Sequence, residues 1–495
     1  MTQNQPNKFL HPDCLSFLWL AIAFILILFS SGKMAIPLLA WLSSIFALRF
    51  MRTQKRGIVG YLLLSFVIMV TMAVSSHGMI PIPPPGIIVF IVMVGLISSL
   101  PFVVDRWLVP HLKGLWATLV FPLASTALEF LNISSSPMGS WGAAGYSQYG
   151  DLILLQILSI TGMWGLSFLM SWLASMVNWA WEQDFEWPKI WRGVALYGGI
   201  MVLVLTYGGA RLTFAQLEPG TVRVASFTEV SIDLAELMPI LSYDREAFRK
   251  KTREIHERYF ERTIREARAG AKIILWPEAA SLNAEEDEAA LLARGQEISK
   301  QEGIYLAMPF FTMYKDVSRP PENKLIVIDP SGSKVLEHIK YGGNVFEGSL
   351  LGDGILRTVE TPYGTLSGVI CWDTDFIVNI AQAGRNGTDI LLSPAHDWRE
   401  ISPLHGQMTV FRAIENGISV VRQSDLGFSI ISDPYGRTLA AMDHYTASDR
   451  TMVAQVPVRG VRTIYSIIGD LFGWMCVAGF VAITIWAIIR WRRRQ

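Results

Sequence analysis

The sequence predicts a multispan α-helical membrane domain joined to an α/β domain. Long apolar runs fill most of residues 12–211 and return at 467–489, whereas apolar strands alternate with amphipathic helices between them. Hydrophobic residues make up 51% of the 495 residues and charged residues 17%, against about 25% charged in soluble domains. We therefore expect a membrane domain of seven spans at 1–212, an extracytoplasmic α/β domain at 213–466, and a last span with a basic cytoplasmic tail at 467–495.

Eight apolar segments are candidate membrane helices, which need about 20 apolar residues each. Lys and Arg gather in the loops after the second, fourth and sixth segments and at 490–494, whereas the loops 75–86 and 132–150 have none. Because short basic loops face the cytoplasm, we expect both termini inside and the α/β domain outside. The segments are Leu15–Ser31, Met34–Phe50, Ile58–Val74, Ile87–Val104, Leu115–Leu131, Leu152–Trp179, Ile190–Leu205 and Ile467–Ile489.

Two features of the membrane domain differ from plain lipid-facing helix. Glu129 lies within an apolar span, where a carboxylate is costly, so it faces the protein interior or water, or else lies near a frayed helix end. The glycine-rich loop Met138–Gln148 is a candidate lid, lipid portal or membrane-surface anchor.

The α/β domain is defined by short apolar strands between longer polar helices. Its clearest helix, Asp244–Ala269, places Phe248, Ile255 and Tyr259 on one stripe. Turns such as Ser331-Gly332 join paired strands and indicate antiparallel additions at the sheet edge. Strands are expected at Val222–Phe227, Lys272–Trp276, Ile304–Phe311, Lys324–Asp329, Val335–Ile339, Leu366–Ile370, Asp389–Ser393, Ser419–Gln423 and Ser429–Ser432, and the other helices at Glu285–Gln301, Asp373–Ala383 and Leu404–Asn416.

Charge and cysteine content narrow the classes of function. Lys plus Arg and Asp plus Glu are both 42, which gives no reason to expect nucleic acid as a partner. Of the three cysteines, Cys14 and Cys476 lie at or in apolar segments, and only Cys371 lies in the α/β domain. A disulfide within that domain is therefore excluded.

Three residues at predicted strand ends form a candidate catalytic group. Cys371 precedes a helix whose N-terminus would favour its thiolate, although a lone cysteine is more often a small buried hydrophobe. Glu278 follows Trp276-Pro277, and a carboxylate under such an apolar wall would resist ionisation and serve as a general base, unless it is a solvated loop residue. Lys340 could stabilise an oxyanion together with the backbone N–H of Trp372, or be one more exposed lysine.

Together these residues resemble the Glu-Lys-Cys triad of the nitrilase, or carbon–nitrogen hydrolase, superfamily. The matching motifs are Leu-Trp-Pro-Glu278, His-Ile-Lys340 and Gly-Val-Ile-Cys371-Trp-Asp, and the likeness continues through Arg412-Ala-Ile-Glu415-Asn-Gly. The resemblance implies a nitrilase-like α-β-β-α sandwich.

The membrane part makes the resemblance more specific, because multispan helices before such a domain and one after it are similar to bacterial apolipoprotein N-acyltransferases. Glu129, Gly145-Tyr146-Ser-Gln148 and Gly208-Gly-Ala-Arg211 also match. The family implies that Glu347 supports the site, and we expect Tyr146 and Trp398 to bind substrate.

Two segments depart from the family pattern. Gly-Asn-Val-Phe-Glu347 stands where the family usually has Val-Pro-Phe-Gly-Glu, and Ser393-Pro-Ala-His396-Asp397-Trp398-Arg399 replaces Ser-Asn-Asp-Ala-Trp-Phe-Gly. Both segments would line the active site, so the acyl donor and acceptor stay open.

The resemblance implies ping-pong acyl transfer at the cytoplasmic (inner) membrane of a bacterium. Membrane phospholipid would donate the acyl chain through a Cys371 thioester, and the diacylglyceryl-cysteine of an apolipoprotein would accept it. We expect no cofactor and no metal, because His338, His396 and His405 do not form a convincing ligand set, and His405 is expected to be structural. The alternatives are a membrane-tethered amidase using the same triad and a non-enzymatic envelope scaffold.

Overall fold

The computed structural model describes residues 15–215 and 220–493 and divides into two compact units. The helical unit comprises the described residues up to Ser135, then Gly142–Thr213 and the chain from Ile468 onward. The α/β unit comprises Ser136–Trp141 and Phe214–Ile467. Cys14 lies outside the described residues, and so does Arg494 of the predicted basic tail.

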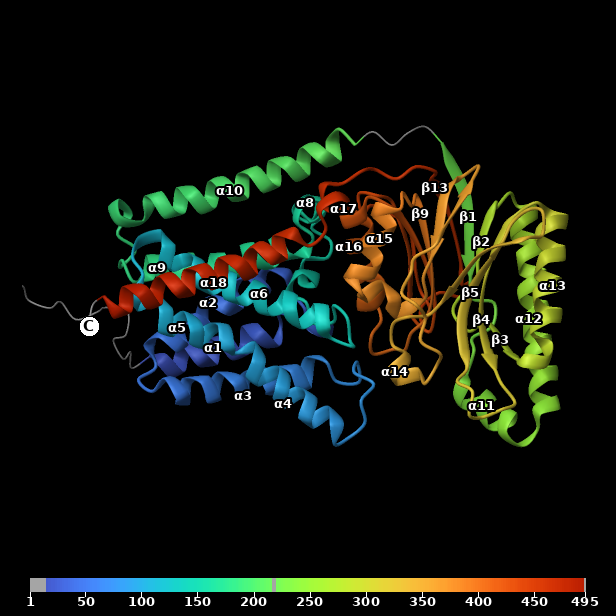
Figure 1. Ribbon diagram of the computed structural model, residues 1–495, viewed down its shortest axis with the longest axis horizontal. Coiled ribbons are helices and arrows are strands. Elements are labelled where there is room, and N and C mark those ends of the chain that lie inside the picture. Colours follow the sequence, from blue (N-terminus) through green and yellow to red (C-terminus); the bar gives the residue numbers. More distant parts are fainter. Residues whose placement is uncertain (1–14, 216–219, 494–495) are drawn as a thin grey trace, which may run out of the picture. The chain divides into compact units, whose positions relative to one another are not determined.

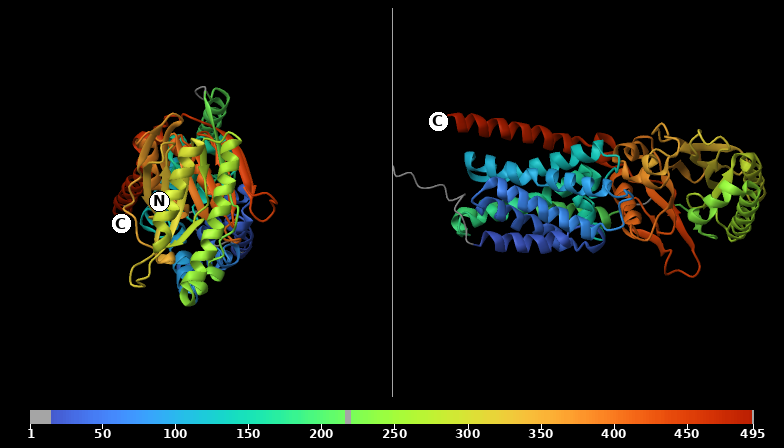
Figure 2. Two further views of the ribbon diagram at one scale, coloured as in Figure 1. Left: turned by 90° about the vertical axis from the view of Figure 1, so that its right-hand side faces the viewer. Right: turned by 90° about the horizontal axis from the view of Figure 1, so that it is seen from below.

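The helical unit is a bundle whose long helices run beside one another (Figure 2). Five of its helical stretches are long and apolar enough to cross a membrane, namely Gly57–Ser75, Gly86–His111, Gly114–Ser135, Trp187–Thr213 and Leu471–Arg492, and a bent pair makes a sixth candidate. Its elements are α1 (Ser16–Leu28), η2 (Gly32–Met34), α2 (Pro37–Thr53), α3 (Gly57–Ser75), α4 (Gly86–Ser98), α5 (Leu100–Leu108), η3 (Val109–His111), η4 (Gly114–Leu119), α6 (Val120–Ser135), η5 (Ala144–Gln148), α7 (Leu152–Leu155), α8 (Leu158–Thr161), α9 (Met163–Trp181), α10 (Trp187–Thr213) and α18 (Leu471–Arg492).

The structure differs from the expectation of eight straight spans in two places. The first two predicted spans form helices of only 13 and 17 residues, and α2 carries the buried Arg52, which pairs with Asp105 at 2.7 Å. The predicted span Leu152–Trp179 is bent by 117°, because Gly162 has a φ of +60° and ends the helix there. Membrane crossing by the first two helices, and the orientation argued from eight spans, stay predictions.

Glu129 lies in the interior of α6 and not at a frayed end. Its Oε1 accepts a hydrogen bond from the backbone N–H of Ala144 at 2.7 Å. The carboxylate is therefore directed at another part of the helical unit, as expected for a charge in an apolar segment.

The α/β unit has four layers, with a helix layer outside each of two facing sheets (Figure 1). The predicted nitrilase-like α-β-β-α sandwich is confirmed. Its elements are β1 (Thr221–Phe227), α11 (Leu234–Tyr243), α12 (Arg245–Arg268), β2 (Ile273–Leu275), β3 (Ser281–Ala284), α13 (Glu285–Glu302), β4 (Tyr305–Met313), β5 (Glu322–Ile328), β6 (Lys334–Ile339), α14 (Asn344–Glu347), β7 (Thr358–Thr361), β8 (Gly364–Gly368), η6 (Cys371–Asp375), α15 (Ile377–Arg385), β9 (Ile390–His396), α16 (Leu404–Asn416), β10 (Ser419–Asp425), β11 (Phe428–Ser432), β12 (Thr438–Asp443), β13 (Thr451–Pro457) and α17 (Ile464–Ile468).

The two sheets have a similar plan, with parallel strands in the middle and antiparallel strands at the edges. One sheet has the order β13-β1-β2-β4-β5-β6, with β3 also paired to β4, and the other has the order β12-β11-β10-β9-β8-β7. Strands β1, β2 and β4 are parallel, as are β8, β9 and β10. The antiparallel edge strands predicted from the turns are confirmed.

Strand β2 shows how the sequence pattern builds these layers. Ile273 and Leu275 belong to the core between the sheets, whereas Ile274 belongs to the core under α12 and α13. Because side chains alternate along a strand, an unbroken apolar run such as this one is buried on both faces. A third apolar cluster, containing Ile380, Ala413 and Val420, packs α15 and α16 on the other sheet.

Candidate active site

The structure brings Glu278 and Lys340 together from two different strand ends. Glu278 lies in the loop after β2, and Lys340 immediately follows β6. The Nζ atom of Lys340 is 2.7 Å from Oε1 of Glu278, and the two side chains are only 1% and 5% exposed. A buried ion pair at strand ends is the kind of charge arrangement that active sites use.

The Glu278 carboxylate is held on both oxygens. Oε1 also accepts a hydrogen bond from Nδ2 of Asn323 at 2.7 Å, and Oε2 accepts one from the backbone N–H of His396 at 2.8 Å. Glu347 makes a second ion pair with Lys340, and its other oxygen accepts from Asn323 at 3.3 Å. The family-implied supporting position of Glu347 therefore lies beside the lysine.

Cys371 is the first residue of η6, at the sharp turn that follows β8. Its φ is +49°, a left-handed conformation that a side-chain-bearing residue adopts only where surrounding contacts hold it. The thiol is nearly buried, and Sγ lies 3.9 Å from both the carbonyl oxygen of His396 and Oδ1 of Asp397. The sulfur thus has polar neighbours although the strand that leads to it is apolar.

Asp373 ties the cysteine turn to the lysine loop. One oxygen accepts from the backbone N–H of Ile370 at 2.8 Å and lies 2.7 Å from Nε2 of His338. The other accepts from the backbone N–H groups of Tyr341 and Gly342 at 2.8 and 2.6 Å. This buried carboxylate therefore fixes Lys340 and Cys371 relative to each other.

The charge states differ from those expected from the sequence. Burial raises the pKa of Glu278, but Lys340 and Asn323 outweigh burial and hold the pKa below that of an ordinary glutamate. Trp276, the residue expected to cover this carboxylate, packs against Tyr259 and donates from Nε1 to Thr263 at 2.9 Å. Glu278 is therefore ionised in the resting site.

The thiol also differs from the expectation of a favoured thiolate. Burial, followed by the negative charges of Glu278 and Asp397, raises the pKa of Cys371 well above its ordinary value, although Lys340 and Arg422 oppose the rise. Burial lowers the pKa of Lys340, but Glu278 and Glu347 outweigh it and hold this pKa well above its usual value. The resting site thus contains a protonated thiol, a carboxylate and an ammonium.

The residues predicted to contact substrate or the oxyanion come from separate parts of the chain. Trp398 directly follows Asp397 after β9 and is half-buried, and Trp372 lies in η6, where its ring stacks on Phe346 at 5.2 Å between centroids. Tyr146 is buried in the helical unit. Substrate binding by Trp398 and Tyr146, and oxyanion binding by the Trp372 amide, stay predictions.

Part of the glycine-rich loop predicted at Met138–Gln148 belongs to the α/β unit. Nε1 of Trp372 donates to the carbonyl oxygen of Met138 at 3.3 Å, and the Ser140 N–H donates to the carbonyl oxygen of Asp375 at 2.9 Å. Trp141 lies with its ring centroid 5.3 Å from that of His405. These contacts place Met138–Trp141 against the turn that carries Cys371.

Sequence reasoning missed a buried polar cluster beside the thiol. Cys371, Asp397 and His405 present their polar atoms within 4.8 Å of one another, so His405 is not remote from the site. Asp397 already contacts Arg422 at 3.0 Å, and a carboxylate lies at each ring nitrogen of His405, so a metal ion would have to displace these partners.

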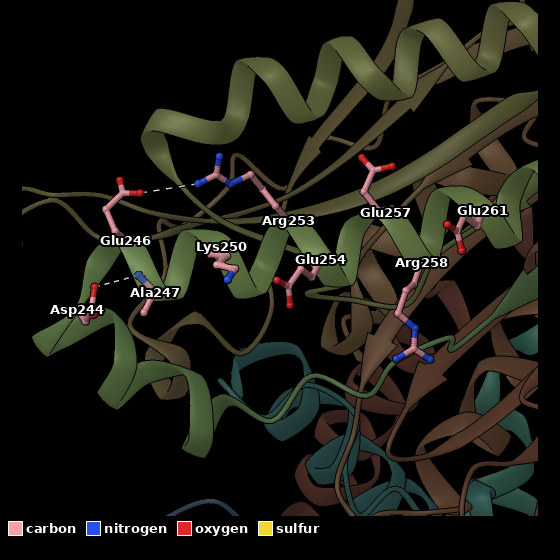
Figure 3. Close-up of a pocket in the computed structure, with 9 residues that line it drawn as sticks. All are labelled: Asp244, Glu246, Ala247, Lys250, Arg253, Glu254, Glu257, Arg258 and Glu261. Carbon is pink, nitrogen blue, oxygen red and sulfur yellow. Dashed lines mark hydrogen bonds and ion pairs between the residues drawn. The ribbon is translucent and has the colours of Figure 1, made fainter.

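A surface hollow along α12 is not a candidate site. Figure 3 shows its lining on the outer face of the helix, where Asp244 accepts from the Ala247 N–H at 2.9 Å and Arg253 lies 3.8 Å from Glu246. Charges of both signs on an exposed helical face are typical of a solvated surface. Glu278, Lys340 and Cys371 do not line it.

Comparisons with known proteins give two family models that match separate parts of the chain. The apolipoprotein N-acyltransferase N-terminal domain matches residues 9–176, and the carbon-nitrogen hydrolase model matches residues 235–465. The apolipoprotein N-acyltransferase of Geobacter metallireducens is 25% identical over 464 residues, which cover 86% of this chain and 84% of that protein. That of Rhodopseudomonas palustris is 24% identical over 68% of this chain and 67% of that protein. Among solved structures, an amidase from Nesterenkonia sp. matches 49% of this chain and 93% of its own, with 18% identity and a TM-score of 0.40.

Proposed function

The chain belongs to the apolipoprotein N-acyltransferase family, and from this membership we propose that it transfers an acyl chain from membrane phospholipid to the N-terminal diacylglyceryl-cysteine of apolipoproteins. The observation that carries the proposal is the buried Glu278–Lys340 pair beside Cys371. In this proposal Glu278, Lys340 and Cys371 form the catalytic triad.

The resting charge states suit general-base catalysis. The thiol has a proton to give, and the ionised Glu278 can take it while Lys340 keeps the carboxylate from being an isolated buried charge. Lys340 stays protonated throughout and supplies positive charge wherever negative charge develops on the substrate.

The reaction proceeds in two halves through a thioester. Glu278 takes the Cys371 proton as the sulfur attacks the ester carbonyl of a phospholipid, and Lys340 with the Trp372 N–H binds the oxyanion. The C–O bond then breaks, and the lysophospholipid leaves with the proton from Glu278. The free α-amino group of the acceptor next attacks the thioester, an amide forms, the C–S bond breaks, and the amine proton returns to the sulfur through Glu278.

The membrane helices fit this substrate pair because both acyl donor and acceptor are anchored in lipid. We place the α/β unit outside the cytoplasm and both termini inside, from the Lys and Arg distribution among the loops. The catalytic cysteine would then meet lipoproteins on the outer face of the bacterial cytoplasmic membrane. Labelling of an engineered cysteine in the exposed segment at Val317 of intact cells would test this side.

The proposed function is tested by acylation of the full-length protein in detergent. Incubation with phospholipid labelled in its acyl chains should leave a hydroxylamine-labile acyl group on the peptide that contains Cys371. Cys371→Ala should carry none, whereas Cys476→Ala, which removes the buried thiol of α18, should be acylated like the wild type.

A second step separates the proposal from its alternatives. Addition of a diacylglyceryl-cysteine peptide should discharge the adduct and give the N-acylated peptide. Ammonia released from an amide, with no acyl adduct from phospholipid, would favour a membrane-tethered amidase. A Cys371→Ala strain with unchanged lipoproteins would favour a non-enzymatic scaffold.

A further inference from the structure

The side of Cys371 formed by β9 and β10 carries a second, fully buried group of charges. Oδ1 of Asp397 lies 3.9 Å from the sulfur, within the range of a thiol hydrogen bond. The same carboxylate contacts Nδ1 of His405 at 2.7 Å, the guanidinium of Arg422 at 3.0 Å and the hydroxyl of Ser424 at 2.8 Å. None of these groups has a role in the reaction proposed above.

Asp397 is an acceptor that does not act as a base. Burial raises its pKa, but Arg422 and His405 outweigh burial and hold the pKa well below the usual aspartate value. Burial lowers the pKa of His405, as does Arg422, but Asp375 and Asp397 more than compensate and keep the pKa above that of an ordinary histidine. Arg422 and His405 thus lie among the carboxylates Asp375 and Asp397 next to the sulfur, and Nδ1 of His405 is also 2.9 Å from the Arg422 guanidinium.

We propose that Asp397 is a positioning residue for the Cys371 thiol, holding the resting sulfur protonated by accepting its S–H and lending negative charge beside it. The groups that face this thiol are Glu278, Lys340, Asp397 and Arg422, with His405 and Asp375 behind Asp397. The inference rests on Cys371 being the nucleophile of the proposed function. Its consequence is a nucleophile that stays unreactive until Glu278 takes the proton with a substrate in place.

The carboxylates on the two sides of the sulfur, Glu278 and Asp397, have different roles in this proposal. Lys340 is the main cation beside Glu278, with a smaller contribution from His396, whereas Arg422 and His405 together hold the pKa of Asp397 well below its usual value, so Glu278 is the better proton acceptor. The backbone of His396 joins the two sides, because its N–H donates to Glu278 at 2.8 Å and its carbonyl oxygen lies 3.9 Å from the sulfur. A movement of Asp397 would therefore also displace the neighbouring backbone of His396, which contacts both Glu278 and the thiol.

The test is the pH dependence of Cys371 alkylation by iodoacetamide in the full-length protein in detergent, followed by mass analysis of the Cys371 peptide. Asp397→Asn keeps the shape but removes the charge, so the midpoint should fall by about 1 pH unit or more and alkylation at neutral pH should become roughly tenfold faster. Arg422→Gln removes the opposing charge and should raise the midpoint.

Asp389→Asn is the matched control. Asp389 is a buried carboxylate that precedes the first residue of β9, lies 3.3 Å from Arg459 and is remote from the sulfur along the strand. It should leave the alkylation midpoint unchanged even if it lowers stability. The proposal would be overturned if the alkylation midpoint of Asp397→Asn equals that of the wild type, or if Asp389→Asn shifts the midpoint by as much as Asp397→Asn does.

The wild-type protein supplies a measurement that needs no buried substitution. Its own midpoint should lie above that of free cysteine, which is about 8.5, and a midpoint at or below this value would also overturn the proposal. The phospholipid adduct, measured on the same preparation, tests the proposed function separately from the role of Asp397. Absence of the phospholipid adduct with the expected midpoint shifts would reject acyl transfer, whereas a normal adduct without the shifts would reject the role of Asp397.

Discussion

Asp373→Asn should destabilise the α/β unit strongly, because this one carboxylate receives four close contacts. Ile370, Tyr341 and Gly342 donate backbone hydrogen bonds to it, and the His338 ring lies 2.7 Å away. An asparagine has only one acceptor oxygen, so two of these contacts become a donor facing a donor. Hydrogen bonds to a charged group each contribute about 1.5–3 kcal/mol, which gives a loss of about 3–6 kcal/mol.

The assay is thermal unfolding of the full chain in detergent. Unfolding is monitored by the reaction of the Cys371 thiol with a probe, because that thiol reports on the turn that Asp373 holds. For a unit of this size the loss corresponds to a fall in the midpoint of about 6–24 °C. Asp353→Asn is the control, since Asp353 is half-exposed and pairs with Arg357 at 2.6 Å, and it should change stability by about 1 kcal/mol or less. Equal midpoints for the two variants would refute the reasoning.

Three further predictions follow from the same structure. Glu278→Gln should slow formation of the acyl adduct by about 10²–10⁴-fold while the protein stays folded, as measured by time-resolved labelling; an unchanged rate would exclude Glu278 as the base. The folded pKa values of Glu278 and Asp373 lie below the unfolded ones, so the stabilisation from these two carboxylates is present above about pH 4 and is lost as the pH falls through the lowered values. The thermal unfolding midpoint of the wild type should therefore drop at acid pH, and that of Asp373→Asn should drop less. Gly417→Ala should be far more destabilising than Gly387→Ala, because both positions have positive φ but only at Gly417 would the new Cβ lie 1.8 Å from the Val461 carbonyl oxygen; comparable unfolding midpoints for the two would contradict this.

The membrane helices show the limit of a hydropathy pattern. Apolar runs correctly marked the helical unit, because burial in lipid or protein requires such residues whatever the detailed fold. Their lengths depend on breaks, and the break at Gly162 depends on a backbone conformation that composition does not encode. The pairing of Arg52 with Asp105, 53 residues away, is likewise invisible in a window of 20 residues.

The three motifs of the proposed triad were recognisable in the sequence because each is local. Glu278, Lys340 and Cys371 each follow an apolar strand within a few residues, and a strand's end is fixed by its own sequence. The pKa directions were not readable, because they depend on which charges are brought within a few ångströms. Lys340 lies 62 residues from Glu278 in the chain yet lowers its pKa.

The sequence by itself therefore determined the two-part organisation, the layered α/β unit and the three strand-end residues, since these follow from periodicity and motifs within short stretches. Only the tertiary structure decided that Asp373 clamps the turn, that Asp397, His405 and Arg422 gather behind the thiol, and that Ser136–Trp141 joins the α/β unit. The physical reason is that electrostatic and hydrogen-bond energies depend on distance in space, and folding brings together groups that are far apart along the chain.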